Sequence, residues 1–271
     1  PQYIGGISNT FKYKNWEFSC FVTMQAGNKI RMNPSFDPAF ADLNVFSKEY
    51  YNRWLNPGDE RKTNIPVIPS QDLIRNIGKE NIEKAYVLLE ECYENGGKLL
   101  VAGNGGSAAD SEHIVGELMK GFENERKLHA NYKEALINSD KELGKTLADN
   151  LQMALPAIAL DGHIALNTAY MNDCEPLLCF AQQVNGYGKN GDVFLAISTS
   201  GNSKNILYAA TVAKAKGMKV IGLTGANDSR LSEMADITIR SSHTRTYMIQ
   251  EHHLPIYHCL CLMLEERFFG E

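Results

Sequence analysis

Short apolar runs alternate with longer amphipathic segments along most of the chain after residue 70. The runs have the length of buried strands, and they occupy residues 99–102, 157–160, 192–197, 219–224 and 236–240. Between them, helical segments with apolar residues every three or four positions are predicted at 71–95, 176–184, 204–216 and 246–268. This alternation predicts an α/β fold with a doubly wound, parallel five-stranded sheet covered by helices on both faces.

Two other stretches of this region follow no such pattern. Residues 120–150 are charged and polar, and we expect a loop there with one short helix near residues 139–151. Asn172 and Asp173 are expected in a turn, before the helical segment that begins near Pro176.

The first 70 residues are organised differently. Apolar and polar residues alternate on both sides of Asn15, which predicts a β-hairpin with its turn at that residue. From residue 33 to 69 the chain is rich in Asn, Pro and Asp and shows no period. We therefore expect two domains: a β-hairpin and irregular appendage at residues 1–70, and the α/β domain at residues 71–271.

Composition narrows the class of protein. The net charge is −5 and there is no basic cluster, which disfavours nucleic acid and anionic membranes as partners. None of the six cysteines forms a Cys-x-x-Cys pair, so we expect reduced thiols in a cytoplasmic protein. No apolar run reaches the length of a membrane helix, and no signal peptide is recognisable.

The loop after the first predicted strand, Gly103-Asn104-Gly105-Gly106, is the first candidate site. Its glycines permit positive φ and a close approach of ligand to backbone, and Ser107 is the expected N-cap of the next helix. Free N–H groups at such a helix start favour an anion. The loop has neither the P-loop lysine nor the Gly-x-Gly-x-x-Gly pattern of dinucleotide sites.

His113 and Glu117 lie four residues apart on this helix and therefore share one face. An imidazole and a carboxylate beside an anion site form the outline of a catalytic pair. A solvated glutamate and a capping histidine explain the same two residues, and this segment alone does not decide between the two interpretations.

A second loop, residues 198–203, carries four hydroxyl groups at the end of another predicted strand. These hydroxyl groups and the N–H groups of the next helix can together bind phosphate oxygens without a lysine. The residues that carry the hydroxyls are Ser198, Thr199, Ser200 and Ser203. Simple helix capping needs only one hydroxyl, so their number favours an anion site.

The final predicted helix is rich in polar ring and amide side chains. Gln250 and His258 are eight residues apart, about 80° round the helix, so both can face one pocket. Pro255 lacks a backbone donor and is expected to kink the helix. These helices could also bind a divalent metal ion such as zinc. Its ligands would be His113, Glu117, Gln250 and His258.

Residues 76–269 resemble the sugar isomerase (SIS) domain, and within it the phosphoheptose isomerases, which interconvert sedoheptulose 7-phosphate and D-glycero-D-manno-heptose 7-phosphate. Three motifs carry the resemblance: Gly103-Asn104-Gly105-Gly106-Ser107 with His113 and Glu117; Ser198-Thr199-Ser200-Gly201-Asn202-Ser203; and Arg245 with Ile249-Gln250-Glu251 and His258. The implied activity is aldose–ketose isomerisation by proton transfer through an enediol, in heptose biosynthesis such as that for lipopolysaccharide.

The resemblance implies roles for individual residues. Glu117 and His258 fall on the family's acid/base pair, with Glu117 as base and His258 as acid. The positions that would contact the substrate and its phosphate are Asn104, Gly105, Gly106, Ser107, Asn172, Asp173, Ser198, Thr199, Ser200, Ser203 and Gln250. The positions of the family's metal site, which holds zinc in some members, are His113, Glu117, Gln250 and His258.

The resemblance also implies a homotetramer with active sites between subunits. In the family an additional N-terminal helix helps to build this tetramer, and here residues 1–70 take its place. Assembly is therefore the property on which this chain departs most from the family pattern.

A separate resemblance is carried by Arg53-Trp54, Pro57-Gly58-Asp59-Glu60 and Thr63-Asn64-Ile65-Pro66. This pattern is similar to the last barrel strands of TonB-dependent outer-membrane glycan receptors. Two strands cannot close a barrel, so receptor function is not implied. Our hypothesis is that residues 1–70 are a fused or misjoined segment, and the alternative is a native β appendage that packs on the main domain.

Two other functions compete with the isomerase. A non-enzymatic SIS protein that binds phosphosugars, such as the DnaA-binding initiator-associating factor, resembles the loops but lacks acid/base residues at positions 117 and 258. A sugar-phosphate-sensing regulator would carry a helix-turn-helix module, and residues 1–70 show none. We therefore expect an enzyme with a small sugar phosphate as its substrate.

Overall fold

The computed structural model describes residues 3–13, 16–26 and 79–270. The chain divides into two compact units, Pro1–Ser70 and Gln71–Glu271. Several expectations lie outside the described residues: the turn at Asn15, the irregular stretch at 33–69 with the receptor-like motif, and the helical residues 71–78. The foreign origin of residues 1–70 therefore stays a hypothesis.

In the first unit, strand β1 (Tyr3–Tyr13) pairs with strand β2 (Trp16–Ala26) in an antiparallel ladder. The register places Ile7 opposite Val22 and Phe11 opposite Phe18. The predicted β-hairpin is therefore confirmed.

The second unit is built on a five-stranded sheet whose strands all run parallel. The strands are β3 (Leu99–Ala102), β4 (Ala157–Ala159), β5 (Val193–Ile197), β6 (Lys219–Thr224) and β7 (Ile237–Arg240). They lie in the order β4-β3-β5-β6-β7. The predicted parallel sheet is therefore confirmed.

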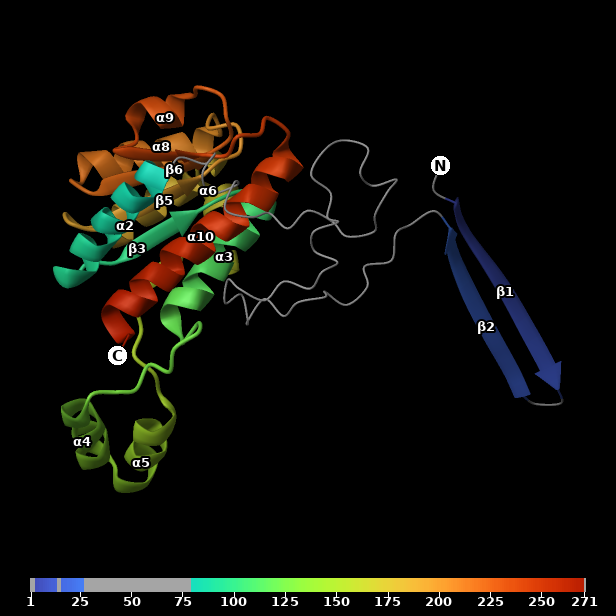
Figure 1. Ribbon diagram of the computed structural model, residues 1–271, viewed down its shortest axis with the longest axis horizontal. Coiled ribbons are helices and arrows are strands. Elements are labelled where there is room, and N and C mark those ends of the chain that lie inside the picture. The colour runs from blue at the N-terminus through green and yellow to red at the C-terminus, as the bar shows by residue number, and fades with distance from the viewer. Residues whose placement is uncertain (1–2, 14–15, 27–78, 271) are drawn as a thin grey trace, which may run out of the picture. The chain divides into compact units, whose positions relative to one another are not determined.

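Helices cover both faces of this sheet (Figure 1). They are α2 (Lys79–Glu94), α3 (Gly106–Met119), α6 (Ile164–Asp173), α7 (Cys179–Tyr187), α8 (Lys204–Ala215), α9 (Arg230–Met234) and α10 (Thr246–Phe269), with a short 3-10 turn at Pro176–Leu178. Two further helices, α4 (Ala130–Ser139) and α5 (Lys141–Asn150), pack on each other. Within the described parts of the chain, no helix is both long and apolar enough to cross a membrane.

Alternate residues of each strand enter different halves of the core, because successive side chains of a strand point to opposite faces. Leu99 and Val101 of β3 pack in the half that contains α2, α3 and α10. Leu100 and Ala102 pack in the half that contains α7 and α8. Strand β3 is therefore packed on both faces, which fixes the position at which the following loop begins.

Residues 120–150 differ from the expected loop with one helix. The structure contains α4 as well as α5. Because α4 has no buried residue, its sequence needs no apolar stripe and shows no helical period. Asp140 separates the two helices, because its side chain caps α5 by accepting hydrogen bonds from the N–H groups of Glu142 (2.9 Å) and Leu143 (2.8 Å). The expectation of a loop is wrong for residues 130–139.

Asn172 and Asp173 also lie elsewhere than expected. They are the last two residues of α6 rather than part of a turn. Asn167 is the one buried residue of that helix, so the hydrophobic pattern does not reveal it.

The strand order places β3 and β5 side by side, although β4 lies between them in the sequence. The connection from β3 enters α3 on one face of the sheet, and the connection from β5 enters α8 on the other. The two connections therefore diverge at the carboxyl ends of these strands. In open parallel sheets, such a switch point is the usual position of a ligand.

A buried ion pair joins the end of α3 to α10. The side chains of Arg126 and Glu265 are both 0% exposed, and 2.8 Å separates Nη2 from Oε1. Arg126 also donates to the carbonyl oxygens of Glu117 (2.8 Å) and Leu118 (2.6 Å), which lack partners within the last turn of α3. Glu265 accepts hydrogen bonds from the backbone N–H groups of residues 122–124.

These contacts keep Glu265 in its charged form although it is buried. Burial by itself raises the pKa of Glu265, but the three backbone N–H groups and the Arg126 guanidinium together lower that pKa below its ordinary value. Glu265 is therefore ionised at neutral pH, and each charge of the pair is compensated within the core.

Replacing Glu265 by Gln should lower the free energy of unfolding by about 3 kcal/mol, because the charge of Arg126 is then buried without a counter-ion. Glu266→Gln is the matched control: this neighbouring side chain is exposed, and its change should alter stability by less than about 0.5 kcal/mol. Urea denaturation followed by circular dichroism gives both values. Equal stability of the two variants would contradict the role of the pair.

The same pair predicts a dependence on acid. A carboxyl group whose pKa is lowered in the folded state adds stability above its unfolded pKa, and this stability is lost as the pH falls through the folded pKa. The difference in unfolding free energy between wild type and Glu265→Gln should therefore shrink below about pH 4. Denaturation curves recorded from neutral to acidic pH measure it, and a constant difference would oppose the lowered pKa.

Candidate active site

The loop between β3 and α3 is shaped by its glycines. A Cβ atom on Gly103 would overlap the carbonyl group of Ser107, and Gly105 has a φ of 58°, so both positions favour glycine. Gly105 is the N-cap of α3, so the expectation for Ser107 is wrong: Ser107 lies buried in the first helical turn. Among the described residues, the N–H groups of Gly105 and Gly106 have no hydrogen-bond acceptor. An anion can therefore bind them.

The loop between β5 and α8 presents hydroxyl groups at the same edge of the sheet. Ser203 is the N-cap of α8, but its side chain does not cap the helix. Its hydroxyl instead lies 3.1 Å from that of the buried Ser198. The hydroxyl of Ser200 accepts a hydrogen bond from the N–H of Asn202 (3.2 Å). Capping of α8 therefore does not explain the hydroxyls of this loop.

Two asparagines join these loops. Asn104 and Asn205 exchange hydrogen bonds between their side-chain amides, with nitrogen-to-oxygen distances of 3.1 and 2.8 Å. Asn205 lies in the first turn of α8, and Asn104 lies between two glycines of the first loop. The amide pair therefore sets the spacing of the two loops, which we call the anion-binding edge (residues 103–107 and 198–203).

A cavity of about 280 Å³ opens beside the second loop. Thr199 and Ser200 line it together with Asn202, Thr246 and the segment 225–228 that follows β6. Two of the predicted phosphate contacts therefore border a hollow at the carboxyl ends of the strands.

Helices α3 and α10 lie side by side and run in the same direction (Figure 1). Near the start of both helices, Gln250 lies so close to Gly106 that a Cβ atom there would overlap its amide. Further along, the Tyr257 hydroxyl lies 3.0 Å from His113 Nδ1. Pro255 lies between these two contacts, and the helix continues on both sides of it.

Both carboxylate oxygens of Glu117 have a partner on α3. His113 Nε2 lies 3.1 Å from Oε1, and Lys120 Nζ lies 3.0 Å from Oε2. The side chain of Glu117 is 12% exposed, whereas those of His113 and Lys120 are 42% and 61% exposed. A ligand can therefore reach the carboxylate by displacing partners that are themselves open to solvent.

His258 stands beside this pair. The centroid of its ring lies 5.0 Å from that of His113 and 5.4 Å from that of Phe122. Burial, and secondly the proximity of His113, lower the pKa of His258 below its ordinary value, while Glu117 acts in the opposite direction. Its Nε2 is buried without a hydrogen-bond partner among the described residues. A neutral imidazole with an unpaired nitrogen is suited to exchange a proton with a ligand.

The two parts of the site are separated in one chain. Glu117 lies 11 residues after Gly106 on α3, which corresponds to about 16 Å of helix. We call His113, Glu117 and His258 the acid–base cluster. It lies about three helical turns along α3 from Gly106, at the start of the helix.

The four residues predicted to bind zinc do not converge. Gln250 meets α3 at Gly106, about 10 Å along the helix before His113. In the described residues, no three His, Cys, Asp or Glu side chains form a group that could hold a metal ion. Zinc binding therefore stays a prediction.

Asn172 and Asp173 are exposed at the end of α6, and Asn172 donates a hydrogen bond to Asp173 at 2.8 Å. Across the described parts of the chain, no hydrogen bond joins either side chain to the anion-binding edge. Their contact with a substrate stays a prediction.

Lys120, Asn205 and Tyr257 belong to the site but are not singled out by the sequence. Lys120 lies three residues after Glu117, so its place on the same helix face is readable from the spacing. Tyr257 directly precedes His258, yet only the packing of α10 decides which side chains it meets. Asn205 has no signal in the sequence beyond its position in a first helical turn.

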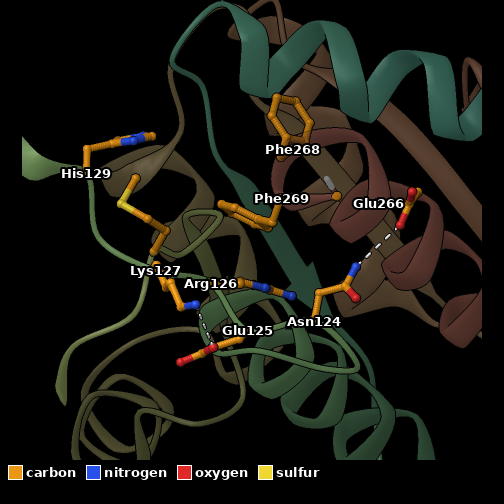
Figure 2. A pocket seen from close by; sticks show the side chains of 10 residues that line it. Asn124, Glu125, Arg126, Lys127, His129, Glu266, Phe268 and Phe269 are labelled. Atoms are coloured by element: carbon orange, nitrogen blue, oxygen red, sulfur yellow. Dashed lines mark hydrogen bonds and ion pairs between the residues drawn. The ribbon is translucent and has the colours of Figure 1, made fainter. Parts of the chain in front are cut away.

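A larger cavity, of about 540 Å³, lies at the far end of α10 (Figure 2). Phe268 and Phe269 line it from α10, and Asn124, Arg126 and His129 line it from the segment before α4. None of the predicted site residues lines this cavity. It is therefore separate from the candidate active site.

The chain matches the SIS domain over residues 69–144 and 141–225. Those residues contain both loops of the anion-binding edge and all of α3. The chain therefore belongs to the SIS-domain family.

Within that family, its relatives are phosphoheptose isomerases. The enzyme of Geotalea daltonii is 37% identical over 204 residues, which cover 74% of this chain and 93% of the relative. That of Aneurinibacillus thermoaerophilus is 34% identical over 203 residues, which cover 75% and 87%. The solved structure of phosphoheptose isomerase from Francisella tularensis is 33% identical, with a TM-score of 0.57 over 72% of this chain and 89% of that one. The predicted resemblance to the SIS domain and to the phosphoheptose isomerases is confirmed.

Replacing Gly106 by Ala should displace Gln250 and leave the fold intact. The new methyl group would overlap the end of a flexible side chain that can move away, so stability should change by less than about 1 kcal/mol. If Gln250 contacts the predicted sugar-phosphate ligand, affinity should fall about tenfold, which titration calorimetry measures.

Gly116→Ala is the control for this change. Gly116 lies on the same helix with open space around its Cβ direction, so the variant should keep its affinity and gain up to about 1 kcal/mol of stability. Unchanged affinity in Gly106→Ala would remove Gln250 from the binding site.

Proposed function

We propose that this chain is an aldose–ketose isomerase that interconverts sedoheptulose 7-phosphate and D-glycero-D-manno-heptose 7-phosphate. One observation carries the proposal: a carboxylate and a neutral imidazole, Glu117 and His258, both lie against His113 in a chain homologous to phosphoheptose isomerases. A protein that only binds a phosphosugar needs no such pair. The choice of a heptose phosphate among possible aldoses and ketoses rests on the homologues, which are phosphoheptose isomerases.

The anion-binding edge would hold the phosphate. Its donors are the N–H groups at the start of α3 and the hydroxyls of Ser107, Ser198, Thr199, Ser200 and Ser203. These donors are neutral, so a phosphate bound by them stays exchangeable between turnovers. Its binding energy would position the other end of the sugar.

The acid–base cluster would move the protons. From the ketose, the Glu117 carboxylate takes a proton from C1, and the His258 imidazole donates a proton to the carbonyl oxygen at C2. Glu117 then returns the proton that it took from C1 to C2 of the enediol. The C1 hydroxyl gives its proton to His258, which leaves an aldehyde at C1. The reverse reaction exchanges the steps, and no proton is gained or lost overall.

The proposed reaction needs residues from more than one subunit. From C1 to the phosphorus, a heptose 7-phosphate has eight bonds of about 1.5 Å and spans at most ~12 Å. It is therefore too short to join a phosphate at the start of α3 to the cluster about 16 Å further along the same helix. We propose that one subunit binds the phosphate and another supplies Glu117 and His258, in a homotetramer.

Two smaller proposals concern the setting of the enzyme. A cytoplasmic location is supported by the five cysteines of residues 79–270, which are free. Zinc is proposed as an optional ligand with no part in the steps above. Titration of the chelator-treated protein with zinc, followed by native mass spectrometry, tests its binding.

Glu117→Gln and His258→Gln should each lower kcat for sedoheptulose 7-phosphate by about 10²–10⁴-fold, because each removes a group that transfers a proton. Glu112→Gln is the matched control, since Glu112 is an exposed carboxylate on the same helix and should leave kcat within twofold. A coupled isomerase assay measures all three variants. Activity retained in Glu117→Gln would refute its role as base.

Mixing two inactive variants tests the shared site. Ser198→Ala weakens phosphate binding in one chain, and Glu117→Gln disables the cluster in the other, so mixed tetramers should recover part of the activity that neither homotetramer has. The variants are unfolded and refolded together, and their size is checked by analytical ultracentrifugation. No recovery in mixed tetramers would place both parts of the site in one chain.

The competing function has a distinct outcome. A folded, tetrameric protein that binds the sugar phosphate without turnover would be a phosphosugar-binding protein rather than an enzyme. Lack of turnover in a protein that is not tetrameric would instead implicate residues 1–70 in failed assembly.

A further inference from the structure

We propose that Asn202 is a positioning residue for phosphate binding, because its side chain holds the turn at Ser200 so that the Ser200 hydroxyl presents its proton to the cavity. The proposal deepens the function proposed above, since it rests on phosphate binding at the anion-binding edge. Asn202 is not among the predicted contacts, although it lies between Ser200 and Ser203 in the sequence.

The Asn202 side chain is hydrogen-bonded through both ends of its amide. Its Nδ2 donates to the carbonyl oxygen of Ser200 at 2.9 Å, and its Oδ1 accepts from the backbone N–H of Arg230 at 3.2 Å. Arg230 is the first residue of α9, so its N–H has no acceptor within that helix. One amide therefore joins the second loop of the edge to the start of a separate helix.

The chemistry of these partners fixes the orientation of the amide. A backbone carbonyl only accepts a hydrogen bond and a backbone N–H only donates one, so the reversed amide would place like groups against each other at both contacts. An aspartate at this position would lack the donor for Ser200, and an alanine would lack both groups. The contacts therefore require an amide side chain.

Backbone contacts hold the neighbouring residue of the loop. The N–H of Leu231 donates to the carbonyl oxygen of Gly201 at 3.0 Å. Gly201 has a φ of 62°, and a Cβ atom there would overlap the side chain of Ser229. These contacts fix the main chain next to Ser200, and the Asn202 amide fixes Ser200 itself.

The Ser200 hydroxyl keeps a proton to donate. A hydroxyl group has one proton and can accept two hydrogen bonds. Ser200 Oγ accepts from the N–H of Asn202 at 3.2 Å, and its proton has no acceptor among the described residues. The hydroxyl of Ser198, in contrast, donates to that of Ser203. Because Ser200 lines the cavity of about 280 Å³, its proton can be donated to an oxygen of a bound phosphate.

Direct contact between Asn202 and the ligand is the alternative, because Asn202 also lines this cavity. A direct contact would act independently of the Ser200 hydroxyl, whereas a positioning residue acts only through it. A double-mutant cycle distinguishes the two, since it measures whether the effects of two substitutions add.

Titration calorimetry with inorganic phosphate gives the dissociation constants of the wild type, Asn202→Ala, Ser200→Ala and the double variant. Each single substitution should weaken binding about tenfold. Because Asn202 acts through Ser200, the double variant should also be about tenfold weaker than the wild type, rather than about a hundredfold. Additive effects would overturn the positioning role, and so would an unchanged dissociation constant in Asn202→Ala.

Asn150→Ala is the matched control. The Nδ2 of Asn150 also donates to a backbone carbonyl, that of Thr146 at 2.7 Å, but this residue lies on α5, outside the anion-binding edge. The control should bind phosphate as the wild type does. Both asparagines are exposed, so each substitution should lower the midpoint of thermal unfolding by less than about 3 °C. Weaker binding in Asn202→Ala is then a local effect.

Kinetics separate the failure of this proposal from that of the proposed function. In an active isomerase, Asn202→Ala should raise KM for sedoheptulose 7-phosphate about tenfold and leave kcat within about twofold, because the acid–base cluster is intact. A lower kcat with an unchanged KM would overturn the proposal.

The phosphate titrations are informative without turnover as well. Non-additive effects in a protein that has no isomerase activity would support the role of Asn202 and refute the proposed reaction. Weaker binding in Ser200→Ala alone would refute the role of Asn202 and keep the phosphate site. Unchanged binding in Ser200→Ala would refute both the phosphate contact of Ser200 and its positioning by Asn202.

Discussion

The buried ion pair of Arg126 and Glu265 is the interaction on which the geometry of the acid–base cluster depends. Arg126 binds the carbonyl oxygen of Glu117 at the end of α3. Glu265 lies seven residues, about two helical turns, after His258 on α10. The pair therefore ties the helix that carries the carboxylate to the helix that carries the imidazole. Two charges without access to water tolerate little displacement, because any shift leaves one of them uncompensated.

His113 connects the rest of the cluster. It lies against Glu117 on its own helix and against Tyr257 and His258 on α10. The environment acts differently on these neighbours. Glu117 has two polar partners, whereas His258 is partly desolvated and its Nε2 has no partner within residues 79–270. A carboxylate beside an imidazole whose pKa is lowered is the combination that proton transfer at a carbon next to a carbonyl requires.

The anion-binding edge is built on a different principle. Its position follows from the strand order, which sends the connections of β3 and β5 to opposite faces of the sheet. Its donors are backbone N–H groups and hydroxyls, and the Asn104–Asn205 pair links its two loops. About 16 Å of α3 separates this edge from Glu117, and the shared site proposed above joins the edge of one chain to the cluster of another.

The sequence by itself determined the alternation of strands and helices and the chemistry of the loops. Strands such as β5 are apolar throughout because both faces of the sheet are covered, and this signal is local. Helices α4 and α6 bury almost nothing and therefore left no period to read. Only the tertiary structure decided that Gln250 meets Gly106 and that Tyr257 meets His113. Helical spacing reveals which face a residue occupies, but its partner across more than a hundred residues is set by how α10 packs against α3.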